Sequence, residues 1–138
     1  MKVLVIDGQG GGLGKALVSE LSRLIPETPV IALGTNSLAT GAMLRAGAKT
    51  GATGENAIVW QARDADVILG AAGILVSGAM MGEVSPAMTI AIGQSPAIKI
   101  LIPSERCGLI ITGTRPMSLE EAVQETAKRA ATFIQSNQ

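Results

Sequence analysis

An uninterrupted aliphatic run followed directly by glycines is the feature that most constrains the fold of this chain. Residues 3–6 are Val, Leu, Val and Ile, a pattern typical of a parallel strand that is buried on both faces. Residues 7–15 contain five glycines, and leucines then recur at helical spacing up to Leu24. A strand, a glycine-rich turn and an amphipathic helix in this order predict the first unit of an α/β sheet.

The rest of the chain repeats this alternation of strand and helix patterns. It predicts a doubly wound sheet with right-handed crossovers, because parallel neighbours need a long crossover connection. We therefore expect a single Rossmann-like α/β domain over residues 1–138, with a mostly parallel sheet. Further strands are predicted at residues 30–33, 67–69 and 98–102, with a short edge strand at 49–53.

One more strand is expected to run the other way. Residues 109–111 are Leu, Ile and Ile, and only residues 103–108 separate them from the strand predicted at 98–102. This connection is too short for a parallel crossover, so the sequence predicts an antiparallel edge strand.

Composition excludes several classes of function. The chain has no His and no Tyr, which removes triads with a histidine base, histidine-ligated metals and tyrosine acids. Basic and acidic residues balance at 11 each without a basic run, so neither nucleic acid nor a membrane surface is an expected partner. A single cysteine and the absence of a signal-like start lead us to expect a cytoplasmic protein. No metal site is predicted, and no complete set of catalytic residues is found.

The glycine turn has the composition of a phosphate site. Glycines allow a ligand to approach the backbone, and the start of a helix offers free N–H groups and the positive end of its dipole. The turns after the strands at 30–33 and 67–69 are expected at the same edge of the sheet. The predicted ligand is a nucleotide, with NAD(P) as the first candidate. The candidate binding residues are Asp7, Gly8, Gln9, Gly10, Gly11, Gly12, Leu13, Gly14, Lys15, Gly34, Thr35, Asn36, Gly70, Ala71, Ala72 and Gly73.

The spacing Gly8-x-x-x-Gly12-x-Gly14 resembles the cofactor turn of the short-chain dehydrogenases. Residues 66–73, Asp-Val-Ile-Leu-Gly-Ala-Ala-Gly, are similar to that family's strand and Asn-Asn-Ala-Gly turn, with both asparagines replaced. The resemblance implies nucleotide binding. It does not extend to the reaction, because those enzymes use a tyrosine and this chain has none.

Over its whole length the sequence resembles a family of small bacterial proteins of unknown function. This resemblance implies a fold and no established activity. It is carried by residues 5–12 (Val-Ile-Asp-Gly-Gln-Gly-Gly-Gly), 32–36 (Ala-Leu-Gly-Thr-Asn), 51–57 (Gly-Ala-Thr-Gly-Glu-Asn-Ala), 102–103 (Ile-Pro) and 106–108 (Arg-Cys-Gly).

Alternatives stay open at several of these residues. Asp7 either caps the turn by accepting its N–H groups or meets a ribose hydroxyl, a metal ion or Lys15. Asn36 either caps a helix or binds a ribose together with Thr35, at a place where NAD-binding domains usually carry an acid. The glycines themselves either hold a ligand or serve only tight packing.

Other functions compete with simple nucleotide binding. Gly14-Lys15 suggests a P-loop-like phosphohydrolase, although Ala16 replaces the Ser or Thr that holds Mg²⁺. In a small NAD(P)-dependent oxidoreductase, Asp7, Lys15 or Cys107 would assist hydride transfer. Arg106, in the loop after a strand, is a separate candidate for contact with a phosphate or carboxylate. The apolar segment at residues 74–81 exceeds what covering the sheet requires, which predicts a homo-oligomer, with or without a ligand.

Overall fold

The computed structural model describes residues 1–138, with the exception of the side chain of Glu105. A single five-stranded sheet has the order β3-β2-β1-β4-β5, and every pair of neighbours is parallel. The strands are β1 (Val3–Asp7), β2 (Val30–Gly34), β3 (Thr50–Thr53), β4 (Val67–Ala71) and β5 (Ile98–Ile102). The helices are α1 (Gly12–Leu24), α2 (Ser37–Arg45), α3 (Glu55–Ala62), α4 (Pro86–Gln94) and α5 (Leu119–Ser136), with short 3₁₀ helices η1 (Ala72–Leu75) and η2 (Glu105–Cys107).

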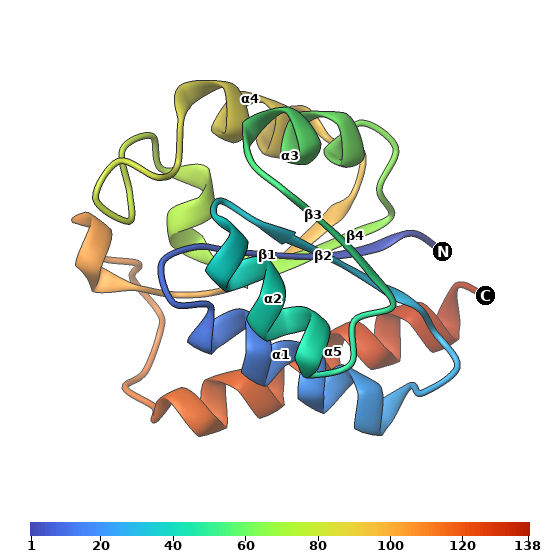
Figure 1. Cartoon of the computed structure of the whole chain (residues 1–138). Coiled ribbons are helices and arrows are strands. Elements are labelled where there is room, and N and C mark those ends of the chain that lie inside the picture. The colour runs from blue at the N-terminus through green and yellow to red at the C-terminus, as the bar shows by residue number, and fades with distance from the viewer.

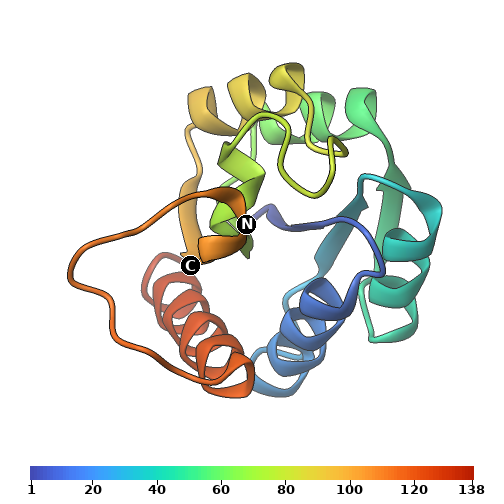
Figure 2. The same ribbon diagram turned by 90° about the vertical axis from the view of Figure 1, so that its left-hand side faces the viewer.

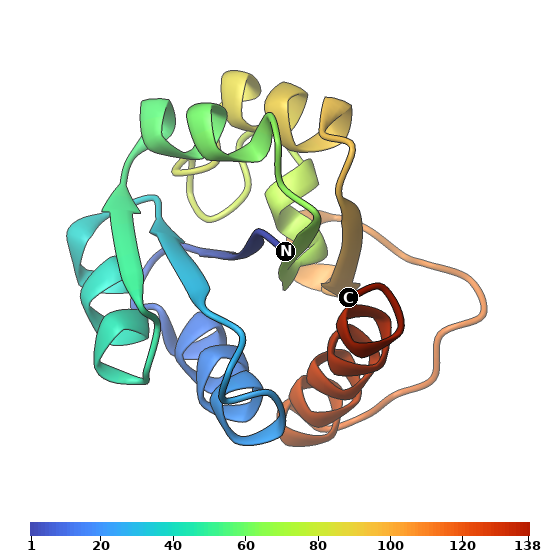
Figure 3. The ribbon, with the colours of Figure 1, turned by 90° about the vertical axis from the view of Figure 1, so that its right-hand side faces the viewer.

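Helices cover both faces of the sheet (Figures 1 and 3). Side chains of β1 alternate between the faces, as successive strand residues must. Val3 and Val5 pack with α1, α2 and α5, whereas Leu4 and Ile6 pack with α3, α4 and η1. β1 is therefore buried along its whole length, which explains its uninterrupted aliphatic sequence.

The order of the strands changes direction at β1. The chain runs outward from β1 to β2 and β3, and it then returns to place β4 on the other side of β1. Val3 accordingly has Val30 of β2 as one neighbour and Val67 of β4 as the other. Figure 2 looks onto the carboxyl ends of the strands, where the turn after β1, residues 77–84 and η2 lie. A reversal of this kind leaves a crevice between the two strand ends.

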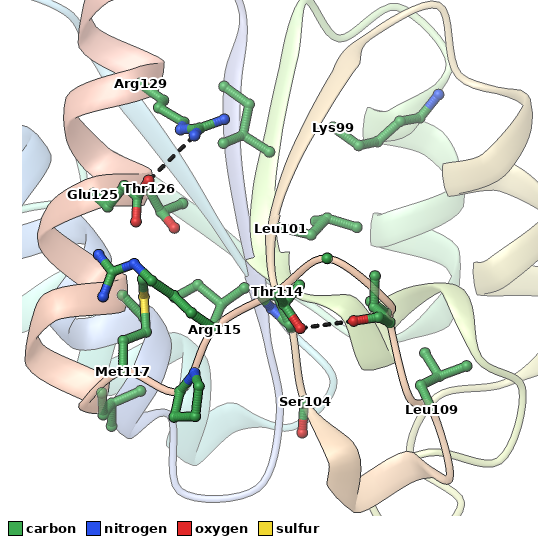
Figure 4. Close-up of a pocket in the computed structure, with 18 of the residues that line it drawn as sticks. Lys99, Leu101, Ser104, Leu109, Thr114, Arg115, Met117, Glu125, Thr126 and Arg129 are labelled. Carbon is green, nitrogen blue, oxygen red and sulfur yellow. Dashed lines mark hydrogen bonds and ion pairs between the residues drawn. The ribbon is translucent and has the colours of Figure 1, made fainter.

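The prediction of an antiparallel edge strand at residues 109–111 is wrong. These residues form no strand, and β5 is the edge of the sheet on that side. Gly108 has a φ of +77°, and a turn closes where the backbone N–H and hydroxyl of Thr114 both donate to the carbonyl of Ile111. The segment then crosses the edge of the sheet to reach α5, which packs beside α1. It stands off from β5 and leaves an open groove of about 1310 Å³ (Figure 4).

Three of the helices begin at a side-chain cap. The side chain of Asn36 accepts a hydrogen bond from the N–H of Ala39 at 2.9 Å, so Asn36 caps α2. Ser85 and Ser118 cap α4 and α5 in the same way. None of the helices described is long and apolar enough to cross a membrane.

A pair of neighbouring glycines tests the packing of the turn after β1. Gly11 has a φ of +75°, and a Cβ there would lie 2.7 Å from the Cα of Ala39, so we expect Gly11→Ala to cost about 1–3 kcal/mol of stability. Gly12 has helical geometry and open space, so Gly12→Ala should instead add up to about 1 kcal/mol. Urea unfolding measures both variants, and equal effects would contradict this account of the turn.

Candidate functional site

The carboxylate of Asp7 closes the turn between β1 and α1. One oxygen accepts a hydrogen bond from the N–H of Gly8 at 2.8 Å, and the other accepts from the N–H of Gly14 at 2.6 Å. The backbone completes the turn, because the N–H of Gly11 donates to the carbonyl of Gly8 at 3.0 Å. Of the roles open to Asp7, the structure shows the capping one. Asp7 and Lys15 form no ion pair in the described part of the chain.

Burial dominates the electrostatics of Asp7. The residue is only 5% exposed, and this burial raises the pKa of its carboxyl above the ordinary value. The N–H groups of Gly14 and Gly8 act in the opposite direction, and the negative charge of Glu83 raises the pKa further. The start of α1 therefore already has an acidic group among its N–H donors.

The glycines of the turn fall into two groups. A Cβ on Gly8, Gly11 or Gly14 would lie 2.6 to 2.7 Å from another atom of the protein, so these three are needed for packing. A Cβ on Gly10 or Gly12 would meet nothing within 4 Å. Packing thus explains only part of the glycine content, and the two glycines without a packing role border open space.

Glu83 is a further acidic residue at this end of the sheet, and it was not among the predicted site residues. One of its carboxylate oxygens accepts hydrogen bonds from the N–H of Gln9 at 2.8 Å, the hydroxyl of Thr35 at 2.6 Å and the amide of Asn36 at 2.9 Å. These donors hold the pKa of Glu83 below its usual range, with Thr35 contributing most. The bonds tie residues 77–84, between η1 and α4, to the ends of β1 and β2.

The sequence contains a signal for Glu83 that was not used. It is the single charged residue between positions 67 and 98, and it stands in an otherwise apolar connection after a strand. A lone charge in such a segment needs a polar partner, and polar partners gather where the strands end.

A cavity of about 660 Å³ lies at the carboxyl ends of β1, β4 and β5. The glycine turn forms one wall, and residues after η1 and β5 form the others. Gly10, Gly12 and Leu13 belong to this wall, and their N–H groups have no hydrogen-bond partner among the described residues. The lining residues are Asp7, Gly8, Gln9, Gly10, Gly11, Gly12, Leu13, Ala71, Gly73, Ala79, Met80, Met81, Ile102, Pro103, Ser104, Arg106, Cys107 and Leu119.

The cavity brings together many, but not all, of the predicted binding residues. The first part of the turn lines it, together with Ala71 and Gly73 after β4. Several of the predicted residues lie outside its lining. These are Gly14, which packs against Met43, the exposed Lys15, Gly34 at the end of β2, Thr35 and Asn36, which both bind Glu83, and the buried Gly70 and Ala72.

Arg106 and Cys107 line the cavity opposite the glycine turn. The thiol of Cys107 donates to the carbonyl of Ser104 at 3.4 Å, and the side chain is partly buried. Arg106 is exposed and is the one basic residue of the lining, so it supplies the positive charge that an anion in this cavity would meet. No group of three or more His, Cys, Asp or Glu side chains suited to a metal ion is found among the described residues.

The groove beside β5 is larger, and none of the predicted site residues lines it. Figure 4 shows Arg115 and Arg129 on its α5 side and Lys99 on β5. Arg129 pairs with Glu125 at 3.2 Å, so part of this charge is already compensated. The smaller cavity is therefore the better candidate for a ligand site, because it contains the N–H groups without a partner.

These observations define the class of the protein: an α/β protein with an all-parallel sheet, a glycine turn after its first strand and a cavity at the strand ends. The chain belongs to the family described as domain of unknown function DUF3842, whose model matches residues 2–135. The resemblance to a family of unknown function is thereby confirmed. No curated protein and no solved structure matches the chain.

The hydrogen bonds of Glu83 predict how stability depends on pH. Because the folded-state pKa of Glu83 is lowered from its ordinary value of 4.5, the carboxylate contributes stability above that value, and this contribution is lost as the pH falls through the folded-state pKa. Thermal unfolding should therefore show that Glu83→Gln is less stable than the wild type at pH 7. The difference in melting temperature between the two proteins should decrease towards pH 3. The control is Glu27→Gln, which removes the charge of an exposed residue between α1 and β2. A difference in melting temperature that increases on acidification would contradict a stabilising role for the Glu83 carboxylate.

Proposed function

We propose that this chain binds a nucleotide whose phosphate rests against residues 10–13 of the glycine turn, with NAD(P) as the first candidate. The observation that carries the proposal is the set of N–H groups of Gly10, Gly12 and Leu13, which have no partner among the described residues and belong to the wall of the cavity. A helix start with free N–H groups favours an anion, and Arg106 adds a positive charge from the opposite wall.

The topology supports a nucleotide over a simple anion. The strand order corresponds to the first five strands of the doubly wound dinucleotide-binding fold, so a Rossmann-like classification suits the sheet. In such sheets ligands bind outside the carboxyl ends of the strands, at the point where the order reverses. The cavity lies at that point, and its volume of about 660 Å³ is within the range of small-molecule sites.

The two alternative reactions receive less support. A P-loop needs its lysine at the phosphates, whereas Lys15 is exposed and does not belong to the lining of the cavity. An oxidoreductase could use Cys107, which lines the cavity. Proton transfer usually needs a histidine or a carboxylic acid, and the buried Asp7 is the one such residue among those that line the cavity. Binding without chemistry, in a sensing or partner-dependent role, is the function that the site supports best.

A charge change at Gly12 tests the binding site. A side chain at this position has open space, and an acidic residue in the first turn favours the helix, so Gly12→Asp should fold normally. We expect it to weaken binding at least about tenfold, because its carboxylate would repel the phosphate. The measurement is a thermal-shift and calorimetric panel with NAD⁺, NADH, NADP⁺, NADPH, FMN and ATP, each with and without Mg²⁺.

Gly12→Asn is the matched control, since it adds the same volume without the charge. It should weaken binding less than Gly12→Asp does. Equal losses of affinity in the two variants would show that the charge at position 12 does not affect binding of the ligand. No shift of the wild type with any of these nucleotides would overturn the proposal, because a ligand at about a hundred times its Kd adds roughly 2.7 kcal/mol of stability.

We also propose that the chain forms a homo-oligomer. Part of the apolar segment at residues 74–81 packs into the core, as Ile74 does, but Met81 is 94% exposed. Ile110, which lines the groove beside β5, is 88% exposed. Large exposed apolar side chains of this kind are typical of interfaces. Light scattering should give a mass at least twice that of the 14.0 kDa chain, and a monomer at working concentration would refute the proposal.

A further inference from the structure

The end of β2 raises a specific question about the proposed nucleotide. Dinucleotide-binding domains usually place an acidic residue there, where it accepts hydrogen bonds from the ribose hydroxyls. In this chain β2 ends in Gly34, followed by Thr35 and Asn36, so the strand provides no acid of its own. 

The structure provides a carboxylate at this place from another part of the chain. Glu83 lies 74 positions from Gln9 in sequence, yet its carboxylate accepts a hydrogen bond from the N–H of that turn residue. Thr35 and Asn36, directly after β2, donate to the same oxygen. The carboxylate therefore lies between the glycine turn and the end of β2.

The hydrogen bonds leave half of the carboxylate available. All the bonds to Glu83 converge on Oε1, and Oε2 has no partner among the described residues. No Lys or Arg of the described part pairs with Glu83, and the residue is partly exposed. Oε2 is thus a fixed, negatively charged acceptor without a donor.

Resting on the proposed function, we infer that Glu83 is the specificity-determining residue that selects a ribose with a free 2′-hydroxyl, so that the chain binds NAD in preference to NADP. The two vicinal hydroxyls of such a ribose are hydrogen-bond donors, and a carboxylate is a favourable acceptor for them. A 2′-phosphate is an anion with acceptor oxygens, and it is repelled at the same place. Thr35 and Asn36 act through Glu83 as positioning residues, because their donors hold Oε1 in place and leave Oε2 without a donor.

The space around Gly8 is consistent with this arrangement. A Cβ on Gly8 would lie 2.6 Å from the Thr35 hydroxyl, 2.7 Å from the Met80 sulfur and 3.0 Å from Glu83 Oε1. These contacts leave no room for a side chain at position 8 and hold Oε1 of Glu83 close to the glycine turn. Glu83 and Thr35 are not among the residues that line the cavity. Met80 and Gln9, which lie next to them, do line it and connect this position to the proposed phosphate site.

Calorimetric titration of the wild type and of Glu83→Gln with NAD⁺ and NADP⁺ tests the inference, because the two ligands differ only by the 2′-phosphate. The wild type should bind NAD⁺ at least about tenfold more tightly than NADP⁺. Glu83→Gln should weaken NAD⁺ by roughly tenfold and reduce the preference to about threefold or less. Glu27→Gln, which removes an exposed charge at the other end of β2, should change neither affinity.

The possible outcomes separate the inference from the proposal beneath it. The wild-type preference needs no variant, so the test does not depend on the folding of Glu83→Gln. Equal wild-type affinities, a preference for NADP⁺, or tighter binding of both ligands by Glu83→Gln would overturn the role of Glu83. The proposal of nucleotide binding would survive those results provided that Gly12→Asp still weakens it. Failure of the wild type to bind either dinucleotide would overturn the role of Glu83, and failure across the whole nucleotide panel would overturn both.

Discussion

The two hydrogen bonds of Asp7 are the interaction on which the rest of this structure depends. They join the last residue of the central strand to the first turn of α1, and so they set how α1 lies against the sheet. The position of α1 in turn decides where α2 packs, because the backbone of Ala39 lies against Gly11, and where α5 packs on the same face. Burial of a carboxylate is costly, and the N–H groups of Gly8 and Gly14 offset that cost.

Asp7 also shapes what the site can bind. By taking the N–H of Gly14, it satisfies one of the donors that a helix start would otherwise present to an anion. Glu83 takes the N–H of Gln9 in a similar way. The donors left over are confined to residues 10–13, so the phosphate-binding capacity of the turn is narrower than its glycine content suggests. A ligand that combines a phosphate with hydroxyl donors matches this mixture of free N–H groups and carboxylates better than a bare polyanion.

Much of the fold could be predicted from local patterns. Aliphatic runs marked four of the five parallel strands, the exception being β3, and Asn36 marked the start of α2, because capping depends on residues within one turn. The wrong prediction concerned residues 109–111. A short connection excludes a parallel pairing, but it does not require any pairing at all, and here the chain had to cross the sheet edge to bring α5 beside α1. The local sequence around residues 109–111 contains no pattern that indicates this path of the chain.

The sequence by itself determined the alternation of elements, the buried central strand and the glycine turn after it, since each of these depends on neighbouring residues and on the periods of helix and strand. Only the tertiary structure decided which glycines pack and which border the cavity, because packing depends on Thr35, α2 and Met80, which follow later in the chain. It also decided that an acid from position 83 lies at the end of β2. The physical reason is the same in both cases: hydrogen bonds and van der Waals contacts act over a few ångströms in space, without regard to distance along the chain.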